Sequence, residues 1–561
     1  MRPIFCCSDG AIAETRDLYG KAAAATPPNI MPTNDDFLLG SRNRDSAEPA
    51  KPICKIELPG NRSPTGPERR RVPDNPWAFI NWLANSQARR IVMRIQHYLM
   101  LGLAWLCLAP WALSQPPQKD TRSLAAFQNA LRRDGFDVNA GRPLEINLVQ
   151  AWCNGTLPDW IPFDHALYSN SQPYLAPAIP KSAAEPGIIS PLFRLGPDEA
   201  IVFIGRTPPP ERYFGFYPFL RTRMGSDGTR QSLWTSLGDP VNNLTVKTTG
   251  STPFNAPVAL IFTSDQGIDA RVRKALERAG YPAAIINTVV FPAPILNLGH
   301  GDTADEFIIA VRNSMWLNRA DGDAYIRNPP LNVFRVTPRS ETIANPFPVP
   351  RLRVRGTGES EMQLMDKLNL LRQRIIEQNP SLQPTDIATQ NTVYEGYDYL
   401  QRGVDPWGDA RDSLYITAGY VPEFGANQDV KLADGEFLMV YGVNHFATGK
   451  ASYHSFNVYS SREGKVPIGS VEDPAFPGTA APYLYDDPAS ANLMYAFKVS
   501  RNCGQEPNCV QLALQDCSRL TIGPNTTLGI FFRMYLEPET KVGPAMPEIL
   551  YDRVIKFSPR P

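Results

Sequence analysis

The sequence predicts a mainly β protein with some helices, built from two tandem related units of the β-sandwich or jelly-roll type. Three observations lead to this fold class. The 561 residues include 55 prolines, about twice the usual share, and proline interrupts helices because it lacks a backbone donor. Apolar and aromatic runs of about five to eight residues alternate with Gly, Pro, Asn and Asp, which is typical of strands and turns. Finally, several segments recur in the same order in the two halves of the chain.

The charge composition limits the class of partner. The chain has 56 basic and 56 acidic side chains, so its formal net charge at pH 7 is zero. Since nucleic-acid binding depends on a basic surface, we expect no nucleic-acid partner. The length also exceeds what a single hydrophobic core usually fills, roughly 250–300 residues, and this favours several domains.

The first 92 residues carry no pattern of a folded domain. Residues 1–92 are polar, rich in proline and arginine, and without periodic apolar positions. Such a segment cannot bury enough apolar surface to fold, so we interpret it as a disordered leader. The alternative is a mis-set gene start, with Met93 as the true first residue, because an export signal follows directly.

Residues 93–114 predict a secretory signal peptide. An arginine follows the first methionine, an apolar run covers residues 98–109, and the small residues Ala112 and Ser114 mark a cleavage site before Gln115. The apolar run is shorter than the ~20 residues of a spanning helix. If the segment stayed uncut, the basic residues before it would make it a type II membrane anchor. We therefore expect a secreted protein, with a membrane as partner only in the second case.

The cysteines after the signal segment predict two disulfides. Cys153, Cys503, Cys509 and Cys517 form an even set that allows three connectivities. Cys503 and Cys509 bracket a turn containing Gly and Pro and can close a small loop, which leaves Cys153 to pair with Cys517. The alternative, a zinc site, lacks the paired C-x2-C spacing.

Three acceptor sequons agree with export. Asn154-Gly-Thr, Asn243-Leu-Thr and Asn525-Thr-Thr each have the N-glycosylation pattern. We therefore predict glycosylation of these asparagines in a secreted chain.

The domain boundaries follow from the linker signals. We predict a first β-rich unit over residues 115–345, a linker and helix over 346–380, and a second β-rich unit over 381–561. One helix is predicted over Asp269–Gly280, which starts with Asp and ends with Gly. A second is predicted over Glu361–Gln378. Its apolar positions Met365, Leu368, Leu371 and Ile375 share one face.

The two β-rich units share matched segments. In each unit a glutamate precedes five apolar residues and a glycine, and four further segments follow in the same order. The continuous apolar runs indicate strands that are buried on both faces. We interpret the matches as a tandem duplication. The matched pairs are 195–205 with 432–442, 213–216 with 453–456, 239–240 with 473–474, 256–262 with 491–497, and 307–312 with 528–533.

Two histidines are the principal candidates for metal binding. His445 and His454 flank the turn 446–450, so a hairpin would bring both imidazoles to one end of a sheet. Two neutral imidazoles and a carboxylate suit zinc, copper or iron. A structural interpretation is simpler: both are loop histidines whose nitrogens are satisfied by backbone carbonyls or water. The segment 300–306, with one histidine and three acidic residues, is a second such cluster.

If the protein is an enzyme, we predict its chemistry near His445. At the corresponding place the first unit has the stiff segment 206–210, which carries no group that titrates near neutrality. Tyr453 and Asp412 are the other catalytic candidates. Asp412 belongs to segment 405–412, where three carboxylates and a tryptophan could serve glycoside hydrolysis, sugar stacking or calcium binding. Turns of this composition are also common for conformational reasons alone.

The sequence leaves three classes of function open. The first is a secreted protein that binds an extracellular small molecule or carbohydrate without catalysis. The second is an extracellular enzyme, either a carboxylate-based hydrolase or a metal-dependent enzyme. The third is a structural protein of the cell surface. The nucleophile-elbow, zincin and dinucleotide motifs are missing from residues 115–561, so no cofactor is assigned.

Overall fold

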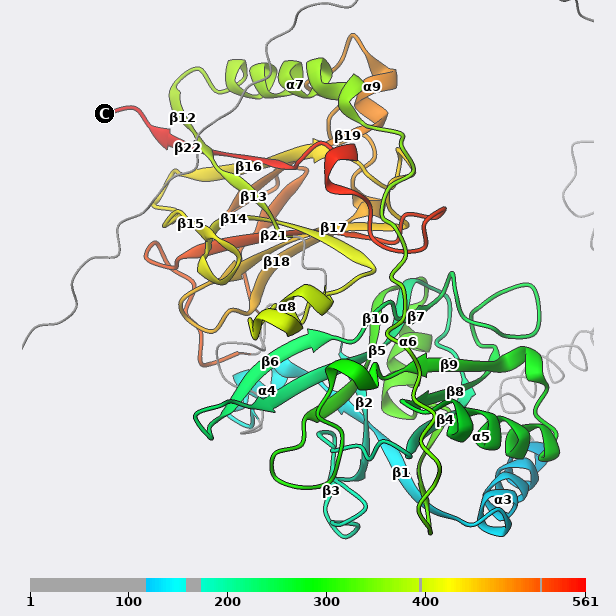
Figure 1. Cartoon of the computed structure of the whole chain (residues 1–561). Coiled ribbons are helices and arrows are strands. Elements are labelled where there is room, and N and C mark those ends of the chain that lie inside the picture. Colours follow the sequence, from blue (N-terminus) through cyan, green and yellow to red (C-terminus); the bar gives the residue numbers. More distant parts are fainter. Residues whose placement is uncertain (1–117, 158–172, 393–395, 515–516) are drawn as a thin grey trace, which may run out of the picture. The chain divides into compact units, whose positions relative to one another are not determined.

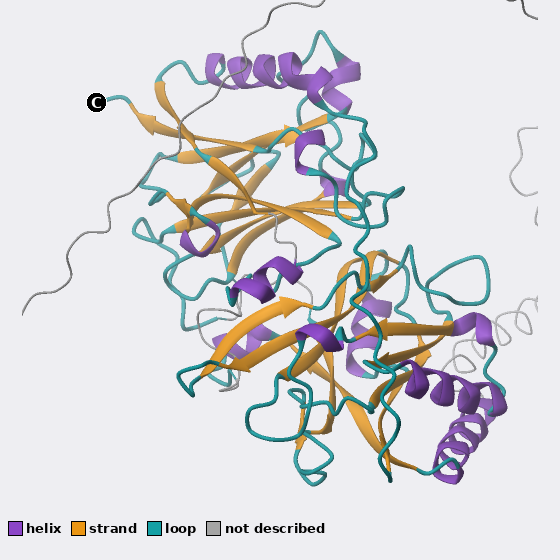
Figure 2. Ribbon diagram, viewed as in Figure 1, coloured by secondary structure: helices purple, strands orange, loops and turns teal. Residues whose placement is uncertain are grey.

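The computed structural model describes residues 118–157, 173–392, 396–514 and 517–561 (Figure 1). The predicted leader (1–92) and signal segment (93–114) lie outside the described residues. The described residues belong to one unit, Trp111–Pro561, and form 22 strands in three sheets. Figure 2 shows that strands and loops make up most of the ribbon, with few helices. The predicted mainly β fold class is therefore confirmed.

The first half of the unit contains an 11-stranded sheet with the order β6-β5-β10-β2-β1-β11-β4-β8-β9, to which β3 and β7 add at the sides. Its strands are β1 (Phe136–Ile146), β2 (Tyr174–Pro180), β3 (Ile189–Ser190), β4 (Ala200–Arg206), β5 (Glu211–Met224), β6 (Arg230–Ser236), β7 (Val241–Asn242), β8 (Pro257–Thr263), β9 (Ile286–Val290), β10 (Glu306–Trp316) and β11 (Leu331–Pro338).

This sheet folds over on itself along β1. Residues 136–141 of β1 pair with β11, and residues 142–146 pair with β2, so β1 belongs to both arms. Phe203 of β4 and Phe216 of β5 come from different arms, and their rings pack edge to face with centroids 6.4 Å apart. The two arms therefore enclose one buried core, as in a β-sandwich.

The second half contains two sheets. The five-stranded sheet has the order β12-β22-β16-β19-β20, and the six-stranded sheet has the order β13-β14-β21-β17-β18 with β15 on β14. Phe456 of β17 and Phe497 of β19 pack across the core between them, with ring centroids 5.8 Å apart. Their strands are β12 (Leu382–Ile387), β13 (Thr389–Thr392), β14 (Ser413–Val421), β15 (Ala426–Asn427), β16 (Phe437–Val443), β17 (Tyr453–Ser460), β18 (Pro467–Glu472), β19 (Met494–Ser500), β20 (Cys509–Gln511), β21 (Leu528–Tyr535) and β22 (Arg553–Pro559).

The two halves agree in strand order. Reading outward from β1, the first half gives β2-β10-β5-β6 on one side and β11-β4-β8-β9 on the other. From β13 and β12, the second half gives β14-β21-β17-β18 and β22-β16-β19-β20. The last pair is parallel in both halves, β8 with β9 and β19 with β20. A common origin of the halves remains a prediction.

The helices α3, α5 and α7 pack on the faces of the sheets that point away from the two sandwich cores. The two predicted helices are present as α5, whose N-cap is Asp265 rather than Asp269, and α7, which buries Leu368, Leu371 and Ile375. The helix α3 was not predicted, although Leu124, Phe127 and Leu131 recur at helical spacing on its buried face. The helices are α3 (Gln118–Arg133), α4 (Leu148–Cys153), α5 (Gln266–Arg278), α6 (Arg319–Arg327), α7 (Met365–Glu377), α8 (Gly396–Arg402) and α9 (Pro488–Asn492). Short 3-10 turns are η2 (Ala283–Ile285), η3 (Ala293–Ile295), η4 (Met362–Leu364), η5 (Pro422–Phe424), η6 (Asp473–Ala475) and η7 (Met546–Glu548).

Both predicted disulfides are present. Cys153 bonds to Cys517, and Cys503 bonds to Cys509, with Cα atoms 4.9 Å and 5.7 Å apart. The first bond fastens α4 to the core of the second half, where Trp152 is also buried. These pairings leave no role for the four cysteines as zinc ligands.

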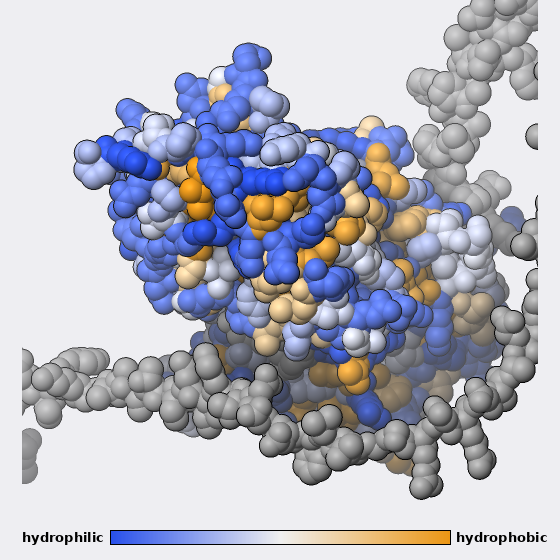
Figure 3. Space-filling view, turned by 90° about the horizontal axis from the view of Figure 1, so that it is seen from above, coloured by the Kyte–Doolittle hydropathy of each residue, from blue (hydrophilic) through white to orange (hydrophobic). Residues whose placement is uncertain are grey.

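One face of the molecule is mostly polar. In the face shown in Figure 3, hydrophilic side chains predominate and apolar ones form separate patches. Asn154 and Asn525 are exposed, whereas Asn243 is partly buried and its side-chain oxygen accepts from the amide of Phe214 at 3.4 Å. Within the described part of the chain, every helix is too short or too polar to span a membrane.

Candidate metal centre

His445 and His454 meet inside the second sandwich, although not through a hairpin. His445 follows β16 and His454 lies in β17, and these two strands belong to different sheets. The predicted hairpin is therefore wrong: the connection 444–452 crosses from one sheet to the other. The ring centroids of the two histidines are 4.5 Å apart, because the connection brings both imidazoles into the space between the sheets.

A carboxylate that the sequence analysis did not single out completes the cluster. Asp552 immediately precedes β22, and its Oδ2 lies 3.6 Å from His445 Nε2. Its Oδ1 lies 3.5 Å from His454 Nε2. All three side chains are completely buried, and one ligand atom of each lies within 4.8 Å of the others. No local sequence signal marks Asp552, since only strand pairing brings it here.

Several polar atoms in this cluster have no hydrogen-bond partner among the described residues. They are His445 Nε2, both ring nitrogens of His454, and Asp552 Oδ2. The distances of 3.5 and 3.6 Å between histidine and aspartate are too long for hydrogen bonds. A buried polar group without a partner destabilises the fold by about 1–3 kcal/mol. A bound species that contacts all of these atoms would remove this cost.

Hydrogen bonds outside the cluster fix two of its three members. His445 Nδ1 lies 2.9 and 3.0 Å from the two carboxylate oxygens of Glu361. Glu361 also accepts from Thr448 Oγ1 and, at 3.0 Å, from the amide of Leu550. Tyr495 donates from its hydroxyl to Asp552 Oδ1 at 2.5 Å. Such partners orient ligands in metal sites, where a carboxylate commonly holds the second nitrogen of a ligating histidine.

The pKa values follow from burial and from these charges. Burial would lower the pKa of His445, but the charges of Glu361 and Asp552 outweigh it and raise the pKa to about 10. Burial lowers the pKa of His454. Burial would raise the pKa of Asp552, yet the two imidazoles hold it well below its usual range. Two carboxylates, Glu361 and Asp552, therefore lie beside the ring of His445, an arrangement that favours positive charge there.

A glycine makes room for the cluster. A Cβ atom at Gly442 would lie 2.5 Å from Asp552 Oδ1 and 3.2 Å from the ring of Tyr495. Since real Cβ atoms do not approach other atoms so closely, any other residue at 442 would displace the aspartate.

The first half has apolar side chains at the same places. Gly205 of β4 pairs with Val258 of β8 and Leu331 of β11, the positions that Tyr495 and Asp552 take beside β16. Phe214 aligns with His454 when 213–216 is matched with 453–456. Val258, Leu331 and Phe214 are all buried in the first core. At these places the second half therefore has a polar cluster where the first half has apolar side chains.

The other two catalytic candidates contact different groups. Tyr453 donates to Glu472 Oε1 at 3.3 Å, from the face of β17 opposite to His454. Asp412 accepts from Tyr213 at 3.1 Å and from Asn242 Nδ2 at 3.0 Å, and burial raises its pKa to about 7. We therefore assign neither to the metal centre.

The segment around Asp412 joins the two halves. Asp409 accepts hydrogen bonds from the amide and hydroxyl of Ser236. Asp405 accepts from Ser232 at 3.0 Å. Each of the three carboxylates binds a first-half residue, so the segment holds the second half to the first.

The cluster around His300 is held by arginines. Asp302 contacts Arg194 at 3.0 Å, and Asp305 forms a paired contact with Arg223 at 2.9 and 2.6 Å. Carboxylates engaged in this way are not preformed metal ligands.

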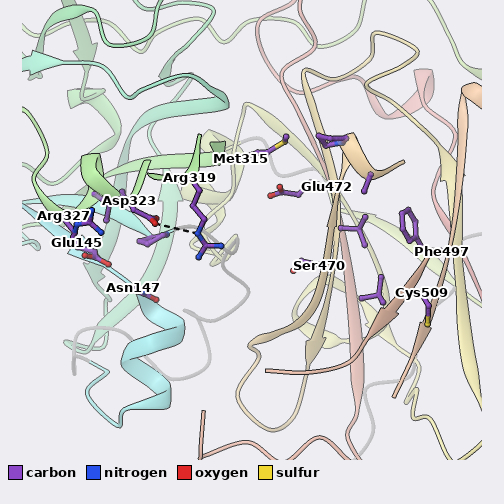
Figure 4. Close-up of a pocket in the computed structure, with 16 residues that line it drawn as sticks. Glu145, Asn147, Met315, Arg319, Asp323, Arg327, Ser470, Glu472, Phe497 and Cys509 are labelled. Atoms are coloured by element: carbon purple, nitrogen blue, oxygen red, sulfur yellow. Dashed lines mark ion pairs between the residues drawn. The ribbon is translucent and has the colours of Figure 1, made fainter. Parts of the chain in front are cut away.

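A cleft of about 950 Å³ is lined by residues of both halves (Figure 4). One wall carries Arg319 and Asp323, whose side chains are 3.8 Å apart, and the other includes Glu472 and Phe497. The ring of Phe497 packs against Phe476, with centroids 6.0 Å apart, and Phe476 lies 5.0 Å from the ring of His454. An aromatic layer therefore separates the cleft from the histidines.

Comparisons with known proteins give only distant similarity. No protein-family model and no curated protein matches the chain. The solved VPA0106 protein of Vibrio parahaemolyticus has 11% identity and a TM-score of 0.31, over 78% of this chain and 95% of that one. An uncharacterized protein of Burkholderia cenocepacia has 12% identity and a TM-score of 0.30, over 80% of this chain and 91% of that one. Neither similarity supports a conclusion about function.

Proposed function

We propose that this chain is a secreted metalloprotein whose second half binds one divalent transition-metal ion through His445, His454 and Asp552, and that the ion serves catalysis. The observation that carries the proposal is the convergence of buried nitrogen and oxygen atoms that lack hydrogen-bond partners. Two ligand atoms on an ion with bonds of about 2.0–2.2 Å lie roughly 3–3.5 Å apart. The separations of 3.5 and 3.6 Å are close to this value.

The donor set limits the kind of ion. Two imidazoles and one carboxylate suit zinc, iron, copper or manganese, whereas calcium and magnesium prefer oxygen ligands alone. Structural zinc sites usually have four protein ligands, while catalytic sites have three and keep a position for water or substrate. Three ligands therefore favour a metal-dependent enzyme over a structural site.

Metal analysis of the purified full chain tests the proposal. We expect close to one transition-metal ion per chain, either as isolated or after loading with Zn²⁺, Fe²⁺, Cu²⁺ or Mn²⁺. Asp552→Asn and His454→Gln should lower the bound fraction at least tenfold. His300→Ala is the matched control, since it removes a histidine outside the cluster, and it should bind like the parent. A folded parent chain that binds none of the four ions overturns the proposal.

A ligand-binding function is the second candidate. The cleft in Figure 4 combines charged groups on one wall with Phe497 on the other, which suits a small polar molecule or carbohydrate. Binding of an oligosaccharide panel to the full chain tests it. Glu472→Gln should weaken any specific binding, whereas Asp302→Asn, at the exposed ion pair with Arg194, should not.

Export is part of the proposal. Two disulfides are typical of proteins that mature in an oxidising compartment. We propose cleavage of the signal peptide before Gln115 and glycosylation of Asn154, Asn243 and Asn525. Glycosidase treatment of secreted protein should lower its apparent mass.

The two halves are also proposed to be related by duplication. The support is the shared strand order, in which four of the five matched segments overlap strands at equivalent places. In this view the second copy acquired the metal ligands, and the first kept an apolar core at the same place. An experimental structure in which residues 190–315 and 430–535 fail to superpose would contradict the duplication.

A further inference from the structure

We propose that the ion at His445, His454 and Asp552 keeps an open coordination position that admits only a small uncharged molecule, and that this molecule is dioxygen on Fe(II). This inference rests on the metal centre proposed above and names the small ligand that its ion binds. Two histidines and one carboxylate with open positions are the ligand set of non-haem Fe(II) sites that activate oxygen.

The polar groups near the cluster already have partners. Tyr495 donates its hydroxyl proton to Asp552 Oδ1, and Thr448 donates to Glu361. Glu361 in turn faces His445 Nδ1, on the side of the ring away from Asp552. Among the described residues, only the two histidines and Asp552 form a cluster with metal-ligand spacing. An ion that takes five or six ligands therefore has positions left over.

The side chains around His454 are mostly aromatic or apolar. Its ring packs edge to face against Phe476 and Tyr495, with centroids 5.0 and 5.6 Å away. Its strand neighbour in β21 is Met534, which is fully buried. Moving a charged group into such an apolar space costs far more than moving a neutral one. The lining therefore favours a neutral ligand.

The burial of the cluster also limits the size of a ligand that can reach the ion. His445, His454 and Asp552 have no exposed surface, and neither have Phe476 and Tyr495 beside them. A sugar or peptide cannot reach the ion without displacing these side chains. A diatomic molecule can pass through the small openings that side-chain motion provides in a packed core.

Nitric oxide is the probe for the open position, because it binds Fe(II) where dioxygen does and gives a stable product. The full chain is freed of metal, loaded with one equivalent of Fe²⁺ without oxygen, and treated with nitric oxide. We expect the EPR signal of a high-spin iron–nitrosyl complex in near-stoichiometric yield. Azide, which is similarly small but anionic, should not reduce this yield even at a hundredfold excess.

The outcomes separate this inference from the metal centre itself. Iron that binds without forming a nitrosyl overturns the open position and leaves the metal centre in place. A chain that binds no iron or other transition metal overturns both. Azide that displaces nitric oxide overturns the restriction to uncharged molecules.

Tyr453→Phe provides the matched control. It removes a hydroxyl on the face of β17 opposite to His454, where Tyr453 donates to Glu472, and it keeps the ring. We expect this variant to bind iron and to form the nitrosyl as the parent does. A nitrosyl yield that falls as far in Tyr453→Phe as in His454→Gln shows that the signal does not come from the cluster, and it overturns the inference.

Discussion

Replacing Glu361 by Gln tests how the metal centre is held. The substitution keeps the shape of the side chain but removes the charge that faces His445 Nδ1 at 2.9 Å. Both residues are buried, with exposed fractions of 1% for Glu361 and zero for His445. Because the remaining histidine loses its buried partner, we expect the metal-free protein to lose about 3–5 kcal/mol of its free energy of unfolding at pH 7. Metal affinity should fall about 10- to 100-fold, as for other partners of ligating histidines.

The pH dependence of the same variant gives an independent check. The pKa of His445 is raised to about 10 in the folded, metal-free protein. Its stabilising effect is therefore fully present below the unfolded pKa of about 6.5 and is lost as the pH rises through about 10. Without the charge of Glu361 the pKa of His445 falls, so the variant should lose this stability at a lower pH than the parent.

Denaturant unfolding in the presence of a chelator measures the stability, and competition with a chelating dye measures the affinity. Glu359→Gln is the matched control, because it makes the same change two residues away at an exposed side chain. We expect the control to stay within about 0.5 kcal/mol of the parent. If Glu361→Gln and Glu359→Gln show equal stability and equal metal affinity, Glu361 does not hold His445 and the reasoning fails.

Three further predictions concern Asp412, the disulfides and export. Burial raises the pKa of Asp412 from 3.8 to about 7, so its stabilising effect is present below pH 3.8 and is lost as the pH rises through about 7. The free energy of unfolding of the parent should therefore exceed that of Asp412→Asn by about 4 kcal/mol less at pH 8 than at pH 4. A difference that stays constant with pH contradicts the shift. Removing the Cys153–Cys517 bond, which spans 364 residues, should cost about two and a half times as much unfolding free energy as removing Cys503–Cys509, which spans 6. Equal losses contradict the loop-entropy reasoning. N-terminal sequencing of secreted protein should begin near Gln115, and recovery of residues 1–92 on it excludes the predicted cleavage.

Local sequence patterns determined the secondary structure class and the disulfides. Prolines and short apolar runs predicted strands, and the strands β4 and β16 lie where continuous apolar residues placed them. The helix α7 was predicted because its buried positions recur at helical spacing. The disulfide pairing followed from the short loop between Cys503 and Cys509, which left the other two cysteines to each other. In each case the deciding interactions are close in the sequence, or only one combination remains.

The sequence predicted two of the three residues of the candidate site. His445 and His454 stood out because histidines are rare in this chain and these two are neighbours. Their predicted geometry was wrong, since a connection of nine residues can join two sheets as well as two adjacent strands, and turn residues do not distinguish the two cases.

Glu361, Tyr495 and Asp552 could not be found from the sequence. Glu361 is 84 residues from His445 and 189 from Leu550, and Tyr495 is 57 from Asp552. No periodicity links such distant positions. Pairing of β16 with β19 and β22 brings two of them together beside Gly442, and the segment before α7 adds the third. The tertiary structure alone decided this site, because its members share a place in the sheet packing and no local sequence relation.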